Sequence, residues 1–366
     1  MIQIDFDNLR VLGLTPGLAR LAALAEDPDD TQSIDDLRLM RLTEVHRETV
    51  RVHDGEHEHG VRVLPRLMRE LAAGDTALAV GDWVLCGTDA YGDYRVHARV
   101  PPLSNICRRD ADGRRHPVVS NVDTALLVMG MDDDFNPRRL ERYLALVQTS
   151  GVLPVVVLTK ADVAANTPGL IESRIEALRG RVPAQVEVLA VDGTDPATAP
   201  HLNAWLAAGQ TVVVLGSSGA GKSTLTNTLL GAAVQDTGAV RAQDSRGKHT
   251  TTSRSLHRLP GGACVIDTPG LRTLRPDADE ATLAAVFEDI AALAAQCRFR
   301  DCRHHDEPGC AVRSTVDADH LRNYHKLLRE ARRDTLTVLE KQQQVAVWKQ
   351  RGKAFRARVK FERGQG

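Results

Sequence analysis

The sequence predicts a multidomain α/β protein with an N-terminal β-barrel, a central parallel α/β domain and a C-terminal helical domain. Three observations support this prediction. Short β-type runs separated by Gly and Asp turns occupy residues 37–115. Apolar strands then alternate with helical patterns through residues 116–278. In residues 279–366 the pattern becomes helical, broken by a Cys- and His-rich loop at 297–310.

Length and composition agree with several globular domains. A chain of 366 residues, 42% apolar and 26% charged, is longer than one ordinary domain. The N-terminus, MIQIDFDN, lacks the apolar stretch of a secretory signal, and no apolar run approaches the length of a membrane span. We therefore expect a cytoplasmic protein without a membrane span, whose cysteines are thiols or metal ligands rather than disulfides.

The net charge of −1 conceals opposite charges at the two ends of the chain. Residues 1–36 are acidic and are expected to form an N-terminal extension. Residues 341–366 carry eight Lys and Arg side chains against Glu362 and are expected to form a basic tail. A basic end indicates a polyanionic partner such as RNA, although a solvated tail explains the charge equally well.

Within the α/β domain the apolar runs TALLVMGM, LPVVVLT, VEVLAV and TVVVLG are typical of buried parallel strands. The stretch NPRRLERYLALVQTSG predicts a helix with Asn136 as its N-cap, Pro137 at its first position and Gly151 after its end. The preceding stretch RRDADGRRHPV, at residues 108–118, is interpreted as an exposed linker.

A phosphate-binding loop is predicted at GSSGAGKS, which fits G-x-x-x-x-G-K-[ST] between an apolar strand and a helical stretch. Its N–H groups and the helix N-terminus would face phosphate. Lys222 would reach the β- and γ-phosphates and act in catalysis, and the Ser223 hydroxyl would bind Mg²⁺. The loop alone does not separate a GTPase from an ATPase or a kinase. The nucleotide-binding residues expected here are Gly216, Ser217, Ser218, Gly219, Ala220, Gly221, Lys222, Ser223 and Thr224.

A second strand end, CVIDTPGL, supplies Asp267 and Gly270. An Asp beside a phosphate loop can hold Mg²⁺, typically through water, and Gly270 can offer its N–H to the γ-phosphate. Alone, DTPG reads as a strand and a turn, but with a phosphate loop about fifty residues earlier a nucleotide site is the better interpretation. Between the two lies RGKHTTTSR, in which Thr250 or Thr251 could close over Mg²⁺. The spacing does not choose between them.

The tetrad TKAD follows the buried strand LPVVVLT and supplies Thr159, Lys160 and Asp162. The Asp162 carboxylate can accept the N1–H and N2 amino hydrogens of guanine, a donor pair that adenine lacks. Lys160 can pack its stem over the base. GTPases usually carry Asn where this chain has Thr159, so the contact to the N7 side of guanine departs from the usual pattern. T-K-x-D is a short pattern that also occurs by chance.

The order of these motifs indicates a circular permutation. In an ordinary GTPase the phosphate loop precedes the tetrad, whereas here the tetrad lies about sixty residues upstream. Chain ends in compact domains tend to lie close together, so joining them and opening the chain elsewhere preserves the sheet and its site. The sequence therefore predicts a circularly permuted P-loop GTPase domain.

The chain resembles the ribosome small-subunit-dependent GTPase A family (RsgA, also called YjeQ). The resemblance covers roughly residues 40–330 and includes VGDWV, SNVDTALLVM, FNPRRLERYL, TKAD, GSSGAGKSTL, KHTTT and DTPG. It implies an OB-fold, a permuted GTPase domain and a zinc-bearing C-terminal domain. It also implies GTP hydrolysis late in small-subunit assembly, with rRNA binding in the GTP state and release after subunit-stimulated hydrolysis.

Hydrolysis without a partner is expected to be slow. Leu271 follows DTPG at the place where Ras-type enzymes carry a water-orienting Gln, and a leucine cannot orient water. His249 resembles the histidine that the family is proposed to use instead. We hypothesise that ribosome docking brings His249 to the attacking water, and the alternative is an exposed loop histidine that contacts RNA or nothing.

The stretch CRFRDCRHHDEPGC predicts a tetrahedral zinc site. Its spacing, C-x4-C-x-H-x5-C, offers three thiolates and one imidazole and leaves no open position, so the metal should be structural and should fold the loop. His305 is a neighbouring alternative, and the pattern of the resembled family favours His304. The expected ligands are Cys297, Cys302, His304 and Cys310.

Basic clusters flank the predicted GTPase domain, and phosphate contacts from them would make RNA binding salt-dependent. We expect the small ribosomal subunit and its rRNA as partners, GTP and GDP as ligands, and a monomer. The alternatives are a permuted GTPase of another ribosomal subunit, an RNA-binding scaffold shaped by nucleotide, and a P-loop ATPase or kinase. The clusters comprise Arg108, Arg109, Arg114 and Arg115, then Arg298, Arg300 and Arg303, and the basic tail with Trp348 and Phe355.

Overall fold

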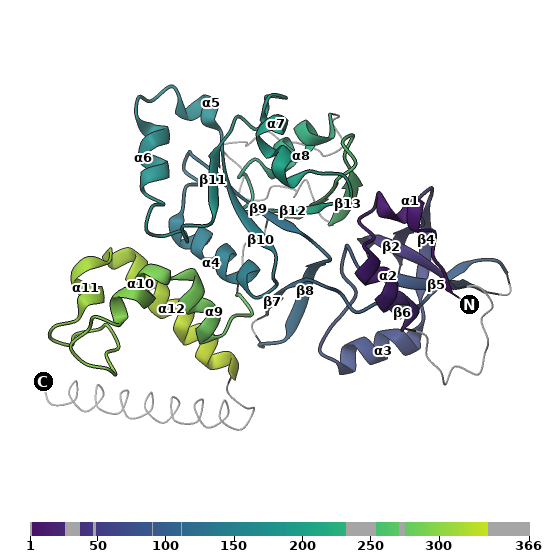
Figure 1. The fold of residues 1–366 in the computed structure, drawn as a ribbon, viewed down its shortest axis with the longest axis horizontal. Helices are drawn as coiled ribbons and strands as arrows, with labels where there is room; N and C mark the ends of the chain where they lie inside the picture. The colour runs from purple at the N-terminus through teal and green to yellow at the C-terminus, as the bar shows by residue number, and fades with distance from the viewer. Residues whose placement is uncertain are drawn as a thin grey trace, which may run out of the picture.

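The computed structural model describes residues 2–25, 37–46, 49–89, 91–110, 112–231, 254–270 and 275–335. Within them a central sheet flanked by helices lies between a β-barrel and a group of C-terminal helices (Figure 1). None of the helices in the described ranges is long and apolar enough to cross a membrane.

Five strands close the barrel in the order β2-β3-β4-β6-β5, because β5 pairs back onto β2. β4 and β6 run parallel, and the other neighbours are antiparallel. Helix α3 (Pro65–Ala73) lies between the third and fourth barrel strands along the chain. This is the five-stranded Greek-key barrel of an OB-fold, as predicted. The strands are β2 (Leu37–Val45), β3 (Val50–His53), β4 (Glu58–Val63), β5 (Trp83–Thr88) and β6 (Tyr94–Arg99).

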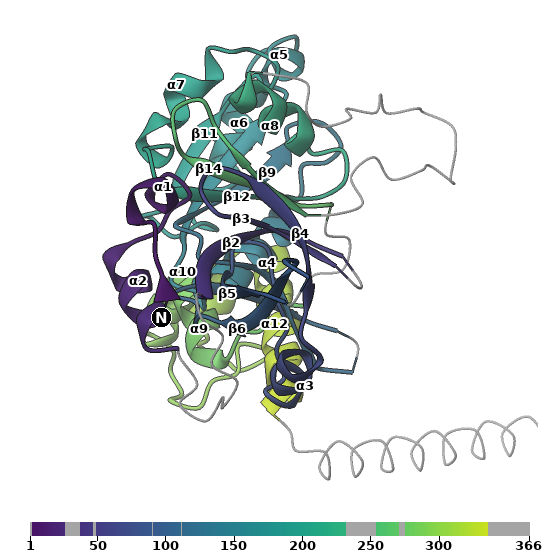
Figure 2. The same cartoon turned by 90° about the vertical axis from the view of Figure 1, so that its right-hand side faces the viewer.

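The described part of the acidic N-terminal segment belongs to the core, which the sequence interpretation missed. Figures 1 and 2 show its helices lying beside the barrel. Thr15 caps the second helix by accepting a hydrogen bond from the N–H of Leu18 at 3.2 Å. Four leucines, Leu9, Leu12, Leu14 and Leu18, are at most 3% exposed. The elements are β1 (Ile2–Gln3), α1 (Phe6–Arg10) and α2 (Pro16–Ala23).

Six strands form the central sheet in the order β11-β10-β9-β12-β14-β13, parallel except for antiparallel β13. Successive side chains point to opposite faces, and two separate groups of buried residues result. Helices therefore cover both faces, as expected of a parallel sheet. The strands are β9 (Thr124–Gly130), β10 (Leu153–Thr159), β11 (Glu187–Ala190), β12 (Thr211–Gly216), β13 (Ser255–Arg258) and β14 (Cys264–Asp267).

Helix α4 (Pro137–Gln148) follows β9 on one face of the sheet. The Asn136 side chain accepts a hydrogen bond from the N–H of Arg139 at 3.1 Å, which confirms the predicted N-cap. Helix α8 (Lys222–Leu230) follows β12 and packs its leucines on the opposite face. The remaining helical elements of this domain are α5 (Ala161–Ala164), α6 (Leu170–Glu176), α7 (Thr198–Leu202) and the 3-10 turn η1 (Asn203–Trp205).

The stretch interpreted as an exposed linker is instead part of a β-hairpin, so that prediction was wrong. β7 (Asn105–Arg109) pairs antiparallel with β8 (Arg115–Ser120) in a separate two-stranded sheet. Two arginines of the hairpin share one carboxylate, because Arg109 and Arg115 both pair with Asp277 at 2.6 Å. The charged sequence that suggested a solvated linker therefore anchors the hairpin to the chain after β14.

The barrel and the central sheet are continuous, because β13 pairs with β2 where Ser255 opposes Glu44. A buried cation reinforces this junction. The guanidinium of Arg41, 0% exposed, donates to the carbonyl of Leu12, to the Thr211 hydroxyl at 2.9 Å and to the carbonyl of Asn121 at 2.8 Å. Arg41 thus joins the N-terminal segment, the barrel and the sheet through hydrogen bonds that a buried charge requires.

In the described part of the C-terminal domain, residues 279–335, four helices are present, and α9 and α12 pack on α4. On α4, Arg142 makes a bidentate pair with Glu330 at 2.8 and 2.7 Å, and the Nε atom of Arg138 donates to Asp319 at 2.8 Å. The helices are α9 (Glu280–Val286), α10 (Glu288–Ala294), α11 (Ala311–Thr315) and α12 (Ala318–Thr335).

A buried histidine of α12 completes the contact with α4. His320, 2% exposed, places Nδ1 at 2.8 Å from Glu141 and Nε2 at 3.3 Å from Asp289. Burial alone would lower its pKa, but the hydrogen bonds to Asp289 and Glu141 prevail and raise the pKa of His320 to about 9. The imidazolium is therefore the folded form at neutral pH.

We expect the stability of this contact to fall as pH rises. A histidine whose pKa is higher in the folded than in the unfolded state stabilises the fold fully below the unfolded value of 6.5, and this contribution disappears as pH passes about 9. Thermal unfolding between pH 7 and pH 9.5 should show this loss, and His320→Gln should flatten the difference. An equal pH response in His320→Gln and the parent chain would contradict the assignment.

Candidate nucleotide site and metal cluster

The predicted phosphate loop connects β12 to α8, between a buried strand and a helix N-terminus. At its first position a Cβ on Gly216 would meet the carbonyl oxygen of Val128 on neighbouring β9 at 2.4 Å. Only glycine fits there, so the loop can begin close to the sheet and turn its N–H groups towards a phosphate.

Lys222 lies inside this loop rather than in solvent. It is 6% exposed, and its Nζ donates to the carbonyl oxygen of Ser217 at 2.7 Å. Burial lowers the pKa of Lys222, while the nearby carboxylates of Asp267 and Asp134 favour its charged form. The ammonium group is thus held at the loop, where the phosphates of a nucleotide would bind.

Asp267 ends β14, directly beside β12 in the sheet. Its side chain is fully buried, and among the described residues neither carboxylate oxygen has a hydrogen-bond partner of normal geometry. Burial raises the pKa of Asp267 to about 6, against the opposing effects of Lys222 and the neighbouring Ser223 hydroxyl. A buried carboxylate beside a hydroxyl fits Mg²⁺, which prefers oxygen ligands. Asp267 and Ser223 are therefore the residues that would hold this ion.

The DTPG turn reaches the phosphate loop. A Cβ on Gly270 would meet the backbone N of Ser218 at 2.5 Å, so a larger residue would push the two segments apart. Gly270 therefore lies next to the phosphate loop, and its contact with a γ-phosphate stays a prediction.

The predicted base-reading tetrad, residues 159–162, lies at the same edge of the sheet, because β9 pairs with both β10 and β12. Thr159 is 1% exposed, and its hydroxyl donates to the carbonyl oxygen of Ala220 at 2.6 Å. This hydrogen bond links β10 to the phosphate loop. It gives the Thr159 hydroxyl a structural role at the position where GTPases usually carry Asn. Lys160 has a φ of 64° and pairs with Asp132 at 2.6 Å, and Asp162 is exposed in the first turn of α5.

The structure thus brings the tetrad, the phosphate loop and DTPG to one edge of the sheet. His249, Thr250, Thr251 and Leu271 lie outside the described residues, so their predicted roles stay predictions.

A second site lies in the C-terminal domain, where the four predicted metal ligands meet. Their donor atoms all lie within 4.8 Å of one another. The Nδ1 atom of His304 is 3.6 Å from the sulfur of Cys297 and 3.5 Å from that of Cys310, and the two sulfurs are 3.9 Å apart. With Zn–S bonds of about 2.3 Å, the edges of a tetrahedron measure about 3.8 Å. The cluster of Cys297, Cys302, His304 and Cys310 therefore fits zinc.

His305, the alternative ligand, stacks instead on His325 of α12, with ring centroids 4.2 Å apart. The neighbouring His304 has a φ of 61°, and its ring lies within the cluster instead. The loop that carries the metal ligands, residues 297–310, thus contacts α12 through this pair of rings.

The RsgA GTPase family model matches residues 100–276. A curated Small ribosomal subunit biogenesis GTPase RsgA from Xanthomonas oryzae pv. oryzae (strain MAFF 311018) is 46% identical over 295 residues, covering 78% of this chain and 79% of that protein. The chain belongs to the RsgA GTPase family. The relative from Xanthomonas axonopodis pv. citri (strain 306) is also 46% identical, over 298 residues. Membership confirms that the protein is a GTPase that hydrolyses GTP, for which the family uses Mg²⁺.

Solved structures of RsgA-like proteins agree on the fold. YjeQ from Thermotoga maritima superposes with a TM-score of 0.57 at 22% identity, covering 81% of this chain and 98% of that one. YloQ, described as a circularly permuted GTPase, gives 0.55 at 21% identity and covers 84% and 99%. The predicted permutation is therefore confirmed.

Sequence reasoning missed two carboxylates beside the predicted nucleotide site, Asp132 and Asp134. Both belong to the stretch MDDDFN that follows β9, and Asp134 accepts a hydrogen bond from the Ser217 hydroxyl of the phosphate loop at 2.6 Å. The available signal was three consecutive acids at the carboxyl end of a buried strand, the edge at which parallel α/β sheets bind ligands.

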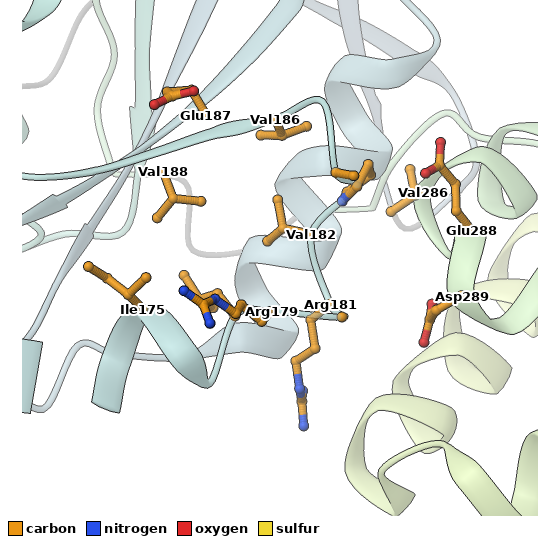
Figure 3. Close-up of a pocket in the computed structure, with 14 residues that line it drawn as sticks. Ile175, Arg179, Arg181, Val182, Val186, Glu187, Val188, Val286, Glu288 and Asp289 are labelled. Atoms are coloured by element: carbon orange, nitrogen blue, oxygen red, sulfur yellow. The ribbon is translucent and has the colours of Figure 1, made fainter. Parts of the chain in front are cut away.

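A cavity of about 530 Å³ lies apart from this site, between the α6–β11 connection and helices α9 and α10 (Figure 3). Valine side chains line one wall, and Arg181, Glu288 and Asp289 border it. Arg181 also pairs with Glu141 at 3.2 Å and with Asp317 at 2.5 Å. The cavity therefore belongs to the junction with the C-terminal domain rather than to the nucleotide site.

Proposed function

We propose that this protein matures the small ribosomal subunit, binding rRNA in its GTP state and leaving after subunit-stimulated hydrolysis. The observation that carries the proposal is its similarity, across 79% of their length, to curated relatives named small ribosomal subunit biogenesis GTPases. A GTPase site and a metal-bearing domain on the same chain are consistent with a nucleotide-controlled binding cycle.

Within this cycle Asp162 reads guanine, Lys160 packs over the base, and the phosphate loop with Lys222 binds the phosphates. Ser223 and Asp267 hold Mg²⁺, joined by Thr250 or Thr251, and His249 orients the attacking water. The exposed position of Asp162 supports its role in base reading, and the buried carboxylate of Asp267 supports its role in holding Mg²⁺.

The charge of the C-terminal domain supports an RNA partner. A groove of about 940 Å³ between α4, the loop at 297–310 and α12 is lined by eight Arg and Lys side chains. Five of them, Arg138, Arg139, Arg142, Arg322 and Arg332, pair with carboxylates. Lys326 and Arg329 are exposed one turn apart on α12, and neither has a carboxylate partner among the described residues. Such a surface matches a phosphate backbone.

We also propose a cytoplasmic monomer with an N-terminal extension at 1–36, an OB-fold at 37–115, a GTPase domain at 116–278 and a metal-binding domain at 279–366. The buried leucines of α1 and α2 argue that the extension folds together with the barrel.

Phosphate release from GTP, measured with and without purified small ribosomal subunits, tests the proposal. We expect a low rate alone and a steep rise with small subunits but not with large ones. His249→Ala should keep the low rate and lose the rise. A rate unchanged by small subunits would remove the ribosomal assignment while leaving the GTPase in place, and full stimulation of His249→Ala would remove only the role of that histidine.

A further inference from the structure

The connection between β9 and α4, residues 131–136, lies at the nucleotide site. None of the motifs predicted for that site (TKAD, GSSGAGKS, RGKHTTTSR and DTPG) includes it. Its sequence is MDDDFN. Strand β9 lies between the strand that carries the tetrad and the strand that leads into the phosphate loop. The connection therefore emerges between the two halves of the site.

Asp134 contacts the phosphate loop directly. Its Oδ1 accepts a hydrogen bond from the Ser217 hydroxyl at 2.6 Å, and its Oδ2 accepts one from the N–H of Gly130 at 3.2 Å. The carboxylate is also held by Arg139, which pairs with Oδ1 at 2.9 Å and donates to the Asp134 carbonyl at 2.7 Å. The Asp134 side chain is 13% exposed, so these contacts are shielded from water.

The bond to Ser217 continues towards the lysine that binds phosphate. While the Ser217 side chain donates to Asp134, its carbonyl oxygen accepts from Lys222 Nζ at 2.7 Å. Asp134 thus holds the loop residue on which Lys222 rests.

Asp132, two residues earlier, contacts the tetrad. Its Oδ2 accepts a hydrogen bond from Lys160 Nζ at 2.6 Å, and its Oδ1 accepts one from the backbone N–H of Asp134 at 3.2 Å. One short stretch of chain therefore joins the base-reading lysine to the phosphate loop. The remaining acid, Asp133, is exposed and makes no hydrogen bond among the described residues.

We propose that Asp134 is a positioning residue that holds the phosphate loop in its binding conformation through Ser217, and that Asp132 does the same for Lys160. The proposal rests on the GTPase activity and deepens it. A loop already held in its binding conformation loses less conformational entropy when nucleotide binds, so the contact increases the affinity for nucleotide. Because these hydrogen bonds would order the loop for the bound substrate and for the transition state alike, their loss should raise KM and leave kcat nearly unchanged.

Nucleotide binding and turnover by the full-length protein test the proposal. Asp134→Ala and Ser217→Ala should each weaken GDP binding by about 10- to 100-fold, the range expected for a hydrogen bond to a charged group. The double variant should bind GDP no more weakly than the more affected single variant, because both changes remove the same hydrogen bond between Asp134 and Ser217. Asp133→Ala, in the same loop, is the matched control and should bind GDP normally.

Pyrophosphate, which has no base, separates the two acids. In competition with GDP, Asp134→Ala should weaken both ligands, whereas Asp132→Ala should weaken GDP and leave pyrophosphate unchanged. Additive effects in the double variant, or normal GDP binding by Asp134→Ala or Ser217→Ala, would overturn the proposal. Ser217→Ala keeps it testable even if Asp134→Ala does not fold, because a serine-to-alanine change is small. GTP hydrolysis stimulated by ribosomal subunits plays no part in these measurements, so failure here leaves the ribosomal assignment untouched.

Discussion

Replacing Lys222 with alanine is expected to lower kcat/KM for GTP by a factor of about 10²–10³, the usual loss when one preorganised charge-stabilising donor is removed. Lys222 is buried, and its ammonium group rests on the carbonyl of Ser217 inside the phosphate loop. No other described Lys or Arg is held in this loop. Single-turnover hydrolysis of GTP with Mg²⁺ measures the loss.

Two controls make this result specific. Lys326→Ala, on the exposed face of α12, should leave the unstimulated rate unchanged. Asp162→Asn should shift the preference from guanosine to xanthosine triphosphate while keeping hydrolysis, because it changes base reading and leaves the phosphate contacts intact. Normal hydrolysis by Lys222→Ala would show that the phosphates bind elsewhere.

Loss of one metal ligand should have the largest effect on stability. Cys310 is 6% exposed, lies in the four-residue cluster and caps α11 by accepting a hydrogen bond from the N–H of Arg313 at 3.4 Å. Structural zinc contributes an apparent binding free energy of about 10–16 kcal/mol in zinc-finger peptides, so a loop of this size should not fold without it. Cys310→Ser should reduce bound zinc from one ion per chain to nearly none and unfold the C-terminal helices at lower temperature.

Metal analysis together with thermal unfolding by circular dichroism checks this expectation. His305→Ala is the matched control, since His305 lies next to the ligand His304 and outside the cluster. It should keep its zinc. Full zinc content in Cys310→Ser would contradict the assigned ligand set, whereas zinc loss in His305→Ala would restore His305 as a ligand.

The parts of the site that were predictable are those in which backbone geometry dictates residue type. At Gly216 and Gly270 a Cβ would collide with backbone atoms at 2.4 and 2.5 Å, respectively. Because both positions require glycine, the motifs that contain them can be recognised in the sequence. Cys297 and Cys310 are similarly constrained by a metal with fixed bond lengths. Such local requirements survive a permutation, which is why the motifs remained recognisable out of their usual order.

The parts that were not predictable depend on contacts between segments distant in sequence. Asp134 is assigned only by its distance to Ser217, 83 residues later. The leucines of α1 and α2 read as a weak helical pattern within an acidic segment until the barrel is present to bury them. The hairpin arginines Arg109 and Arg115 resemble solvated charges until Asp277 is placed beside them.

The pairing of Ser255 with Glu44 makes the barrel and the GTPase sheet one continuous sheet. β13 begins at Ser255, immediately after the stretch that contains the predicted switch threonines. If the barrel were bound to a large, rigid partner, it would hold β13 in place through β2. Rotation of the GTPase domain relative to the barrel would then strain the first residues of β13. Torque at the barrel would therefore reach the start of β13 through its pairing with β2, without passing through the nucleotide.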